Sequence, residues 1–240
     1  MISILTPTRN RPNNCERFIK SIYQTTKNRG NIELLFYVDK DDPSIGAYMS
    51  LQSHCFNEYN QFPRVQFNFG DPISVCDSWN LMAKDCMGDV IIMGNDDLIY
   101  RTPNWDIKLI KELSTIKDNI YCAWVNDGIN GERHCAFPII SRKWVETLGY
   151  CFAPEGTFNF GYNDTWVYDI GKRVGRLKYI PDILVEHMHF SKGKAEMDDT
   201  YARNRTQERG NLYQKDKVIF NDYTEKRIWD AGKLIEKIHD

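Results

Sequence analysis

The feature that most constrains the fold is a short apolar run that leads directly into two adjacent acids. Residues 90–93 (Val-Ile-Ile-Met) are uniformly apolar, as is typical of a central parallel strand covered on both faces. Gly94 permits a sharp exit or the close approach of a ligand. Asn95, Asp96 and Asp97 follow where the strand is expected to end. Because ligands of open α/β sheets bind beyond the carboxyl ends of strands, the acids form either a divalent-cation site or a solvated turn.

The first forty residues predict a β-α-β unit. Residues 2–6 form a strand, and residues 7–12 form a polar loop bounded by prolines. The Asn pair at 13–14 is expected to cap the helix that follows. A second apolar strand at 32–38 then ends in another acid, Asp39. Since consecutive parallel strands are joined by right-handed crossovers, this start predicts a parallel sheet.

The alternation of strand and helix continues to about residue 125. Further strands are expected at 65–69 and 120–125, with helices at 44–60, 73–87 and 105–116. This order is typical of a doubly wound sheet. No strand is followed by the Gly-x-Gly-x-x-Gly or Gly-x-x-x-x-Gly-Lys-Ser/Thr pattern, which argues against a dinucleotide-binding enzyme and a P-loop nucleotidase.

The second half of the chain is richer in turns. A strand is expected at 134–140, with Pro138 marking it as an edge strand. A short helix at 142–148 is followed by an aromatic, glycine-containing loop and by a helix that starts near residue 163. Two short strands are expected on either side of Pro181, and the tail from residue 191 is charged and helical.

Composition describes an ordinary globular protein of 240 residues. Its formal net charge of −2 gives no global argument for binding nucleic acid or an anionic membrane. Its 7 cysteines, an odd number without a Cys-x-x-Cys pair, favour reduced core thiols and a cytoplasmic location. No apolar run approaches the roughly 20 residues that cross a bilayer, so no transmembrane segment is expected.

Two groups of side chains are candidate metal ligands. The oxygens of Asn95, Asp96 and Asp97 suit Mg²⁺ or Mn²⁺, which bind proteins through one or two carboxylates and substrate phosphates. His187 and His189 follow a strand at alternate positions, so both imidazoles are expected on one face. Each is either a ligand or a structural histidine, and a zinc site would lack a third nearby ligand.

Two further acids have a functional and a structural interpretation. Asp164, at the start of a helix, is either its N-cap or a general base that an ionised carboxylate in a cleft can provide. Asp39 is either a turn residue or an acceptor for the N–H or hydroxyl groups of a ligand.

In this order, the segments resemble a GT-A type glycosyltransferase and are most similar to the large family 2 group of inverting enzymes. Residues 4–12 resemble the group's first strand and nucleotide loop, and residues 77–80 resemble the helix before its metal motif. Residues 95–97 match the Asp-x-Asp motif, with Asn95 in place of the usual first Asp. Residues 163–164 resemble the Glu-Asp pair that contains the catalytic base. The resemblance covers roughly residues 1 to 190.

The resemblance implies roles for individual residues. Asp39 would contact the base of the nucleotide, and Asp164 would be the catalytic base. Asp97 would bind the metal together with His187 or His189. The other donor-binding residues would be Pro7, Thr8, Arg9, Arg11, Trp79, Asn80, Asn95 and Asp96.

The implied fold is α/β and Rossmann-like, with a central, mostly parallel sheet flanked by helices and a helical C-terminal tail. One GT-A domain would span 1–190, with a nucleotide-sugar half to about 125 and an acceptor half from 126. Residues 191–240 would be an extension packed on it. The implied activity is inverting transfer of a hexose from a nucleotide-diphosphate sugar, preferably a UDP-sugar, to an acceptor hydroxyl, with Mn²⁺ or Mg²⁺.

The sequence is compatible with several classes of acceptor and with two functions other than glycosyl transfer. The acceptor is a saccharide, a lipid-linked glycan, a protein or a hydroxymethylated base in DNA. For DNA, the tail offers a phosphate track, although interleaved acids also fit a solvated helix face. The basic residues of that track are Lys192, Lys194, Arg203, Arg205 and Arg209. A nucleotidyltransferase would need a Gly-rich loop where residues 7–12 lie, and a non-catalytic sugar-nucleotide or glycan-binding module is the third alternative.

Overall fold

The computed structural model describes residues 1–239 and contains one eight-stranded sheet, in the order β3-β2-β1-β4-β7-β6-β8-β5. The strands are β1 (Ile2–Thr8), β2 (Ile32–Asp39), β3 (Arg64–Gly70), β4 (Val90–Met93), β5 (Leu98–Tyr100), β6 (Cys122–Asn126), β7 (Ile139–Ser141) and β8 (Leu177–His187). The helices are α1 (Pro12–Thr25), α2 (Ile45–Glu58), α3 (Val75–Asp85), α4 (Trp105–Leu113), α5 (Arg142–Leu148), α6 (Asn163–Val174), α7 (Asp199–Arg203), α8 (Gln207–Asp222) and α9 (Thr224–His239). The expected α/β class is confirmed.

The first half of the sheet is parallel, as its apolar strands predict. β1 lies between β2 and β4, and β2 also pairs with β3, all in parallel. Because successive side chains of a strand point to opposite faces, the continuous apolar runs contribute residues to two hydrophobic cores, one on each face of the sheet. In β4, Ile92 belongs to the core on one face, and Ile91 and Met93 belong to the core on the other.

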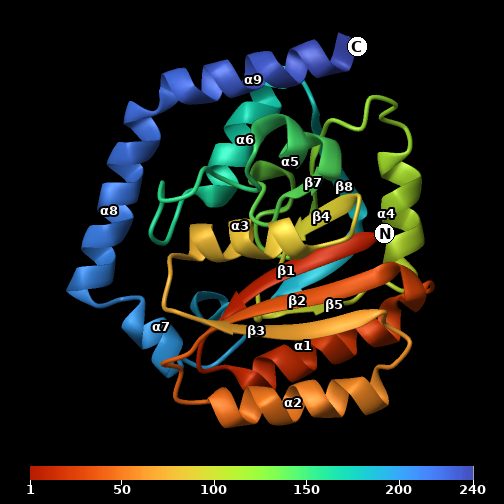
Figure 1. Cartoon of the computed structure of the whole chain (residues 1–240), viewed down its shortest axis with the longest axis vertical. Helices are drawn as coiled ribbons and strands as arrows, with labels where there is room; N and C mark the ends of the chain where they lie inside the picture. Colours follow the sequence, from red (N-terminus) through yellow and green to blue (C-terminus); the bar gives the residue numbers. More distant parts are fainter. Residues whose placement is uncertain (240) are drawn as a thin grey trace.

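Helices cover both faces of this half of the sheet (Figure 1). α1 and α2 pack on one face, where Phe18 and Tyr48 are buried. α3 lies on the other face, where Trp79 packs edge-on against Phe152. This two-sided burial explains why the strands are apolar throughout instead of alternating with polar residues. It also leaves the carboxyl ends of β1, β2 and β4 at one edge of the sheet.

The second half of the sheet is mixed, and the expectation of an edge strand at 134–140 is wrong. β7 contains only Ile139–Ser141 and lies between β4 and β6, antiparallel to both. Pro138 precedes the strand, where its missing N–H costs no ladder bond and its carbonyl accepts a hydrogen bond from Met93 N at 3.0 Å. β4 is therefore parallel to only one of its neighbours.

Two other strand predictions also need correction. The segments on either side of Pro181 form one continuous strand, β8, with a register shift opposite Val125 and Asn126. The shift accommodates a proline, which has no N–H to donate. Leu98–Tyr100, for which no strand was predicted, forms the edge strand β5 antiparallel to β8.

The first helix begins earlier than expected. Pro12 is its first residue and Arg11 is the N-cap, without a capping side-chain hydrogen bond. A proline is suited to this position because its φ is already helical and its absent N–H would have no partner there. The Asn13–Asn14 pair therefore lies inside the helix, and Arg11 is free to direct its side chain elsewhere.

The C-terminal helices wrap around the molecule (Figure 1). α7 lies near the carboxyl ends of the first strands, α8 runs along one side, and α9 crosses α5 and α6. α9 is held by buried polar contacts, including Asp230 Oδ2, which accepts from Tyr150 Oη at 2.7 Å, and Arg227 Nε, which donates to Asp169 Oδ2 at 2.7 Å. Within residues 1–239, none of the helices combines the length and apolarity needed to cross a membrane.

The cysteines are core residues, as their sequence context predicts. All 7 are buried and unpaired in the described part of the chain. Burial raises the pKa of Cys135 and Cys151 well above the ordinary thiol value, so these thiols are protonated and unreactive at neutral pH.

Candidate functional site

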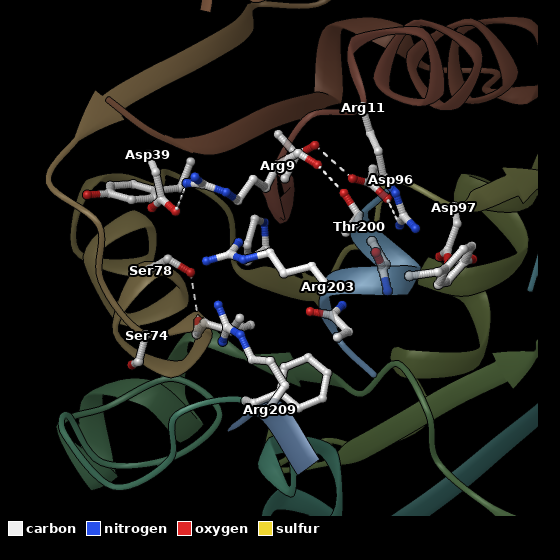
Figure 2. Close-up of a pocket in the computed structure, with 18 of the residues that line it drawn as sticks. Arg9, Arg11, Asp39, Ser74, Ser78, Asp96, Asp97, Thr200, Arg203 and Arg209 are labelled. Atoms are coloured by element: carbon white, nitrogen blue, oxygen red, sulfur yellow. Dashed lines mark hydrogen bonds and ion pairs between the residues drawn. The ribbon is translucent and has the colours of Figure 1, made fainter. Parts of the chain in front are cut away.

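A pocket of about 660 Å³ opens at the carboxyl ends of β1, β2 and β4. Its other walls come from the start of α3, the loop before α6, the end of β8 and the segment spanning α7 and the start of α8. The predicted site residues that line it are Pro7, Thr8, Arg9, Arg11, Asp39, Trp79, Asn95, Asp96, Asp97, His187 and His189. The strand ends thus bring together side chains that are far apart in the sequence (Figure 2).

Gly94 is required by packing within the sheet. A Cβ atom added there would lie 2.1 Å from Thr6 Oγ1 and 3.0 Å from the carbonyl oxygen of Leu5, so β1 approaches too closely for any side chain. The glycine lets the chain turn out of β4 beside β1. It thereby delivers Asp96 and Asp97 to the pocket.

Asp96 is tied to the loop after β1. Its carboxylate accepts a hydrogen bond from Thr8 Oγ1 at 2.7 Å and forms an ion pair with Arg11 Nη1 at 3.0 Å. Burial and the charge of neighbouring Asp97 together raise the pKa of Asp96 to about 6, against the opposing charge of Arg11. Asp96 therefore holds the loop after β1, and its carboxylate already interacts with a hydroxyl and a guanidinium group.

Asp97 has a different environment and keeps one free oxygen. Its Oδ2 accepts from Tyr201 Oη at 2.8 Å and lies 3.3 Å from His187 Nε2. Burial alone would raise the pKa of Asp97, but the contacts with His187 and Tyr201 and the charge of Arg11 lower it overall. Its Oδ1 is buried and has no hydrogen-bond partner within residues 1–239. Such an unsatisfied carboxylate oxygen is costly unless a cation or a hydrogen-bond donor binds to it, which makes it available to a ligand.

The side chains around Asp97 suit a divalent cation whose coordination is completed by a bound substrate. His187 lies beside Asp97, and the ring centroid of His189 lies 5.1 Å from that of His187. Burial and the neighbouring His187 lower the pKa of His189, which favours the neutral imidazole that can ligate a metal. Among the described residues, no three acidic, histidine or cysteine side chains converge as a complete metal site. Mg²⁺ and Mn²⁺ bind with few protein ligands when substrate phosphates complete their coordination.

Asp39 and Arg9 form the opposite end of the pocket. Arg9 Nη1 donates to Asp39 Oδ2 at 2.8 Å and to Asp41 Oδ1 at 2.5 Å. The bond to Asp41 raises the pKa of Arg9, so the guanidinium remains charged. Both side chains point into the pocket in Figure 2, beside the wall formed by Ser74 and Ser78 of the α3 region. This end presents both hydrogen-bond donors and acceptors.

The C-terminal segment contributes a wall that the sequence pattern did not indicate. Tyr201 reaches Asp97 across a separation of 104 residues, and Arg11 stacks over its ring at 4.1 Å from the centroid. Asp198 accepts two hydrogen bonds from the guanidinium of Arg11, both of 2.8 Å. Thr200 Oγ1 donates to the carbonyl of Arg9 at 2.8 Å. The tail is therefore part of the site and not only a packed extension.

The basic residues of the tail separate into two groups. Arg203, Arg205 and Arg209 line the pocket. Lys194 lies outside the pocket lining and forms an ion pair with Glu186 at 2.9 Å. The basic residues therefore do not form one continuous track, because the fold brings the arginines inward and pairs this lysine with an acid.

Two predicted site residues do not line the pocket. Asn80 is buried, where its side chain donates to the carbonyl of Ala153 at 2.8 Å and accepts from Cys151 N at 2.8 Å. Asp164 lies in the first turn of α6, and its N-cap interpretation is wrong. The cap residue is Tyr162, in a left-handed conformation without a side-chain capping bond.

The carboxylate of Asp164 has a partner that the sequence did not suggest. Its Oδ2 lies 2.8 Å from His134 Nε2, and its Oδ1 accepts from Thr165 N at 2.7 Å. The hydrogen bond to Asp164 raises the pKa of His134. Both oxygens of the acid are thus fixed in direction, in a partly exposed position at the start of α6. Sequence alone gave no signal because 30 residues separate the pair.

Comparison with known proteins rests on structure. No family model and no curated protein sequence matches the chain. Among solved structures, the mannosyltransferase PcManGT from Pyrobaculum calidifontis, in complex with GDP-Man and Mn²⁺, is similar with a TM-score of 0.62 at 10% identity. That match covers 93% of this chain and 75% of PcManGT.

Two further structures are similar over most of the chain. S. aureus TarS 1-349 in complex with UDP-GlcNAc has a TM-score of 0.57 at 10% identity, covering 93% of this chain and 72% of TarS 1-349. GalNAc-T7 with UDP, GalNAc and Mn²⁺ has a TM-score of 0.64 at 14% identity, and the match covers 79% of this chain but only 44% of GalNAc-T7. With its mixed eight-stranded sheet and flanking helices, the chain therefore has the fold of the GT-A type glycosyltransferases.

Proposed function

We propose that this protein is a metal-dependent inverting glycosyltransferase. It transfers a hexose from a nucleotide-diphosphate sugar, preferably a UDP-sugar, to an acceptor hydroxyl. The observation that carries the proposal is Asp97, whose buried Oδ1 has no hydrogen-bond partner among residues 1–239 and lies in the lining of a 660 Å³ pocket. The structural relatives PcManGT and GalNAc-T7 bind Mn²⁺ together with GDP-Man or with UDP and GalNAc.

The donor fits the pocket with its nucleoside at Asp39 and its diphosphate toward Asp97. Asp39 and Arg9 offer an acceptor and donors to the base and ribose, and Trp79 offers an aromatic face. Asp97, with His187 or His189, would hold Mn²⁺ or Mg²⁺. The bound cation would stabilise the negative charge that grows on the leaving diphosphate.

Asp164 is the proposed general base. It would accept the proton of the acceptor hydroxyl while that oxygen attacks the anomeric carbon opposite the leaving diphosphate, so the configuration inverts. The proposal is supported by the partly exposed carboxylate of Asp164, held by His134 and Thr165. Asn159 and Phe160 of the preceding loop line the pocket, so the acceptor would bind between this loop and the donor.

A screen of sugar nucleotides with Mn²⁺ tests the proposal. Glycosyltransferases hydrolyse their own donor slowly when water replaces the acceptor, so one sugar nucleotide is expected to be consumed. Mass spectrometry of the released nucleotide and sugar identifies it. A screen in which several donors bind but none is hydrolysed, with or without candidate acceptors, would favour the non-catalytic binding module. Transfer of a nucleotidyl group would favour the nucleotidyltransferase.

The acceptor class is tested with the donor identified in that screen. Saccharides, lipid-linked glycans, proteins and DNA containing hydroxymethylated bases are incubated with the protein and the labelled donor. We favour a glycan, lipid-linked or protein acceptor over DNA, because the basic residues of the tail do not form one continuous track. Label in DNA and in none of the other acceptors would overturn that preference.

A further inference from the structure

The C-terminal segment brings two further arginines into the pocket. Arg203 is the last residue of α7 and Arg209 lies in the first turn of α8. Within residues 1–239, neither guanidinium forms a hydrogen bond or an ion pair. The other arginines of the pocket differ, since Arg9 is paired with an acid and Arg11 is paired with two.

Positive charge is concentrated at this wall. Burial, together with the charges of Arg209 and Arg9, lowers the pKa of Arg203 against the opposing charges of Asp39 and Asp41. Like charges that perturb one another in a half-enclosed pocket repel, and an anion bound between them would remove the repulsion. The net charge of the whole chain is −2, so a general excess of basic residues does not account for this cluster.

The two arginines face the start of α3. In Figure 2 their side chains extend into the pocket opposite Ser74 and Ser78. Ser74 is the N-cap of α3, a helix of 11 residues whose N-terminus favours negative charge. Two guanidinium groups opposite a helix N-terminus form a surrounding that suits a phosphate ester.

This wall is distinct from the acid pair. Tyr201 of the short helix α7 contacts Asp97, whereas Arg203 interacts electrostatically with Asp39 and Asp41. One short helix therefore presents a tyrosine to Asp97 and an arginine toward the acids that follow β2. An anion at the arginines would be bound by side chains and would need no cation.

We propose that Arg203 and Arg209 form an anion subsite that binds a phosphate ester without a metal ion. The phosphate is either the diphosphate of the sugar nucleotide or a phosphate carried by the acceptor. In both cases the subsite would bind a substrate of the proposed transferase, so the source of the phosphate rests on the proposed function. Binding of an inorganic anion to it is independent of catalysis.

Calorimetric titration of inorganic pyrophosphate in EDTA tests the subsite. The wild-type protein is expected to bind pyrophosphate, and R203A/R209A to bind it about 10- to 100-fold more weakly, because hydrogen bonds from two charged donors are lost. The matched control is K215A/K217A, which removes two exposed positive charges from α8 outside the pocket and is expected to bind normally. Since these guanidinium groups form no hydrogen bond or ion pair within residues 1–239, circular dichroism should match that of the wild type.

Two results would overturn the proposal. One is the absence of pyrophosphate binding by the wild-type protein in EDTA. The other is equal binding by wild type and R203A/R209A. Failure of the proposed transferase has a different signature, because a protein that hydrolyses no sugar nucleotide would still bind pyrophosphate through these arginines.

Titrations of uridine and UDP distinguish the two sources of phosphate. If the subsite takes the donor diphosphate, R203A/R209A weakens UDP binding about 10-fold or more, leaves uridine binding unchanged, and saturating UDP abolishes pyrophosphate binding to the wild type. If the subsite takes a phosphate of the acceptor, pyrophosphate still binds to the UDP-saturated protein, and that binding is lost in R203A/R209A.

Discussion

Two adjacent carboxylates in this protein have opposite surroundings. The carboxylate of Asp96 contacts the hydroxyl of Thr8 and the guanidinium of Arg11, and burial raises the pKa of Asp96 to about 6. Asp97 retains a buried oxygen without a partner, while contacts with His187 and Tyr201 help to lower its pKa. The difference supports our proposal that Asp97 binds the metal, while Asp96 holds the loop after β1. The sequence motif indicated Asp97 as the metal ligand, and the surroundings of the two acids give a physical reason for that choice.

Asp164→Asn is expected to abolish most of the transfer without affecting the donor. Asparagine has the same shape but does not accept a proton, and general-base catalysis contributes about 10²- to 10⁴-fold to rate. The rate constant for transfer should fall by that factor, while the dissociation constant of the donor, measured by calorimetry, stays within about twofold. Full transfer activity in this variant would remove Asp164 from the mechanism.

His134→Gln tests the ion pair with Asp164 through its pH dependence. The pKa of His134 is raised above 6.5 in the folded protein. The pair therefore stabilises the fold below pH 6.5, and this stabilisation is lost as the pH rises through the raised folded pKa. Because both side chains are partly exposed, the effect should stay below about 1 kcal/mol.

Urea unfolding of wild type and His134→Gln between pH 6 and 9 measures this effect. The difference in unfolding free energy should be largest near pH 6 and shrink as the pH rises. His54→Gln, which removes an exposed histidine from α2, should show no such trend. A difference that grew with pH would contradict the assignment of the pair.

At the scale of elements, α8 holds the loop that leads to Asp164. The buried carboxylate of Asp216 accepts hydrogen bonds from Asn159 N, Phe160 N and Gly161 N, at 3.0, 2.8 and 2.9 Å. Because Asn159 and Phe160 also line the pocket, this helix fixes one of its walls. The aromatic loop is therefore ordered by a residue more than fifty positions away.

Asp216→Asn should loosen this loop. The amide replaces one acceptor oxygen by an NH₂ group that faces backbone N–H donors, so about 1.5 to 3 kcal/mol of unfolding free energy should be lost. Hydrogen exchange at the amides of Phe160 and Gly161 should also accelerate. Asp222→Asn, at the exposed end of the same helix, is the control. Unchanged exchange at both amides would mean that the loop is held by other contacts.

The elements that the sequence predicted well are those with a strong local pattern. The apolar runs of β1, β2 and β4 and the amphipathic helix α1 are close to their expected positions. β5 and β7 contain three residues each, too few to show a period, and they exist because β8 and β4 pair with them. β8 extends through Pro181 because a register shift accommodates the missing N–H.

At the scale of the whole molecule, the site is built from both ends of the chain. The N-terminal half of the pocket could be predicted because parallel strands bring their carboxyl ends to one edge. The contributions of Asp198, Tyr201 and Arg203 could not, because a short helix after a loop carries no pattern that specifies where it docks. The wrapping of α7, α8 and α9 depends on tertiary contacts such as Asp230 with Tyr150.

The central claim is that Asp97 binds a divalent cation, and that this cation makes the sugar nucleotide reactive by stabilising the leaving diphosphate. The most direct measurement is the rate of sugar-nucleotide hydrolysis as Mn²⁺ is added to metal-free wild type and to Asp97→Ala. The wild-type rate should rise to saturation with Mn²⁺ and return to background in EDTA. The variant, still folded by circular dichroism, should stay at least about 100-fold slower at every Mn²⁺ concentration, because a developing charge loses its principal stabilisation. Hydrolysis by the wild type that is indifferent to Mn²⁺ and EDTA, or an Mn²⁺ response that Asp97→Ala retains, would contradict this account.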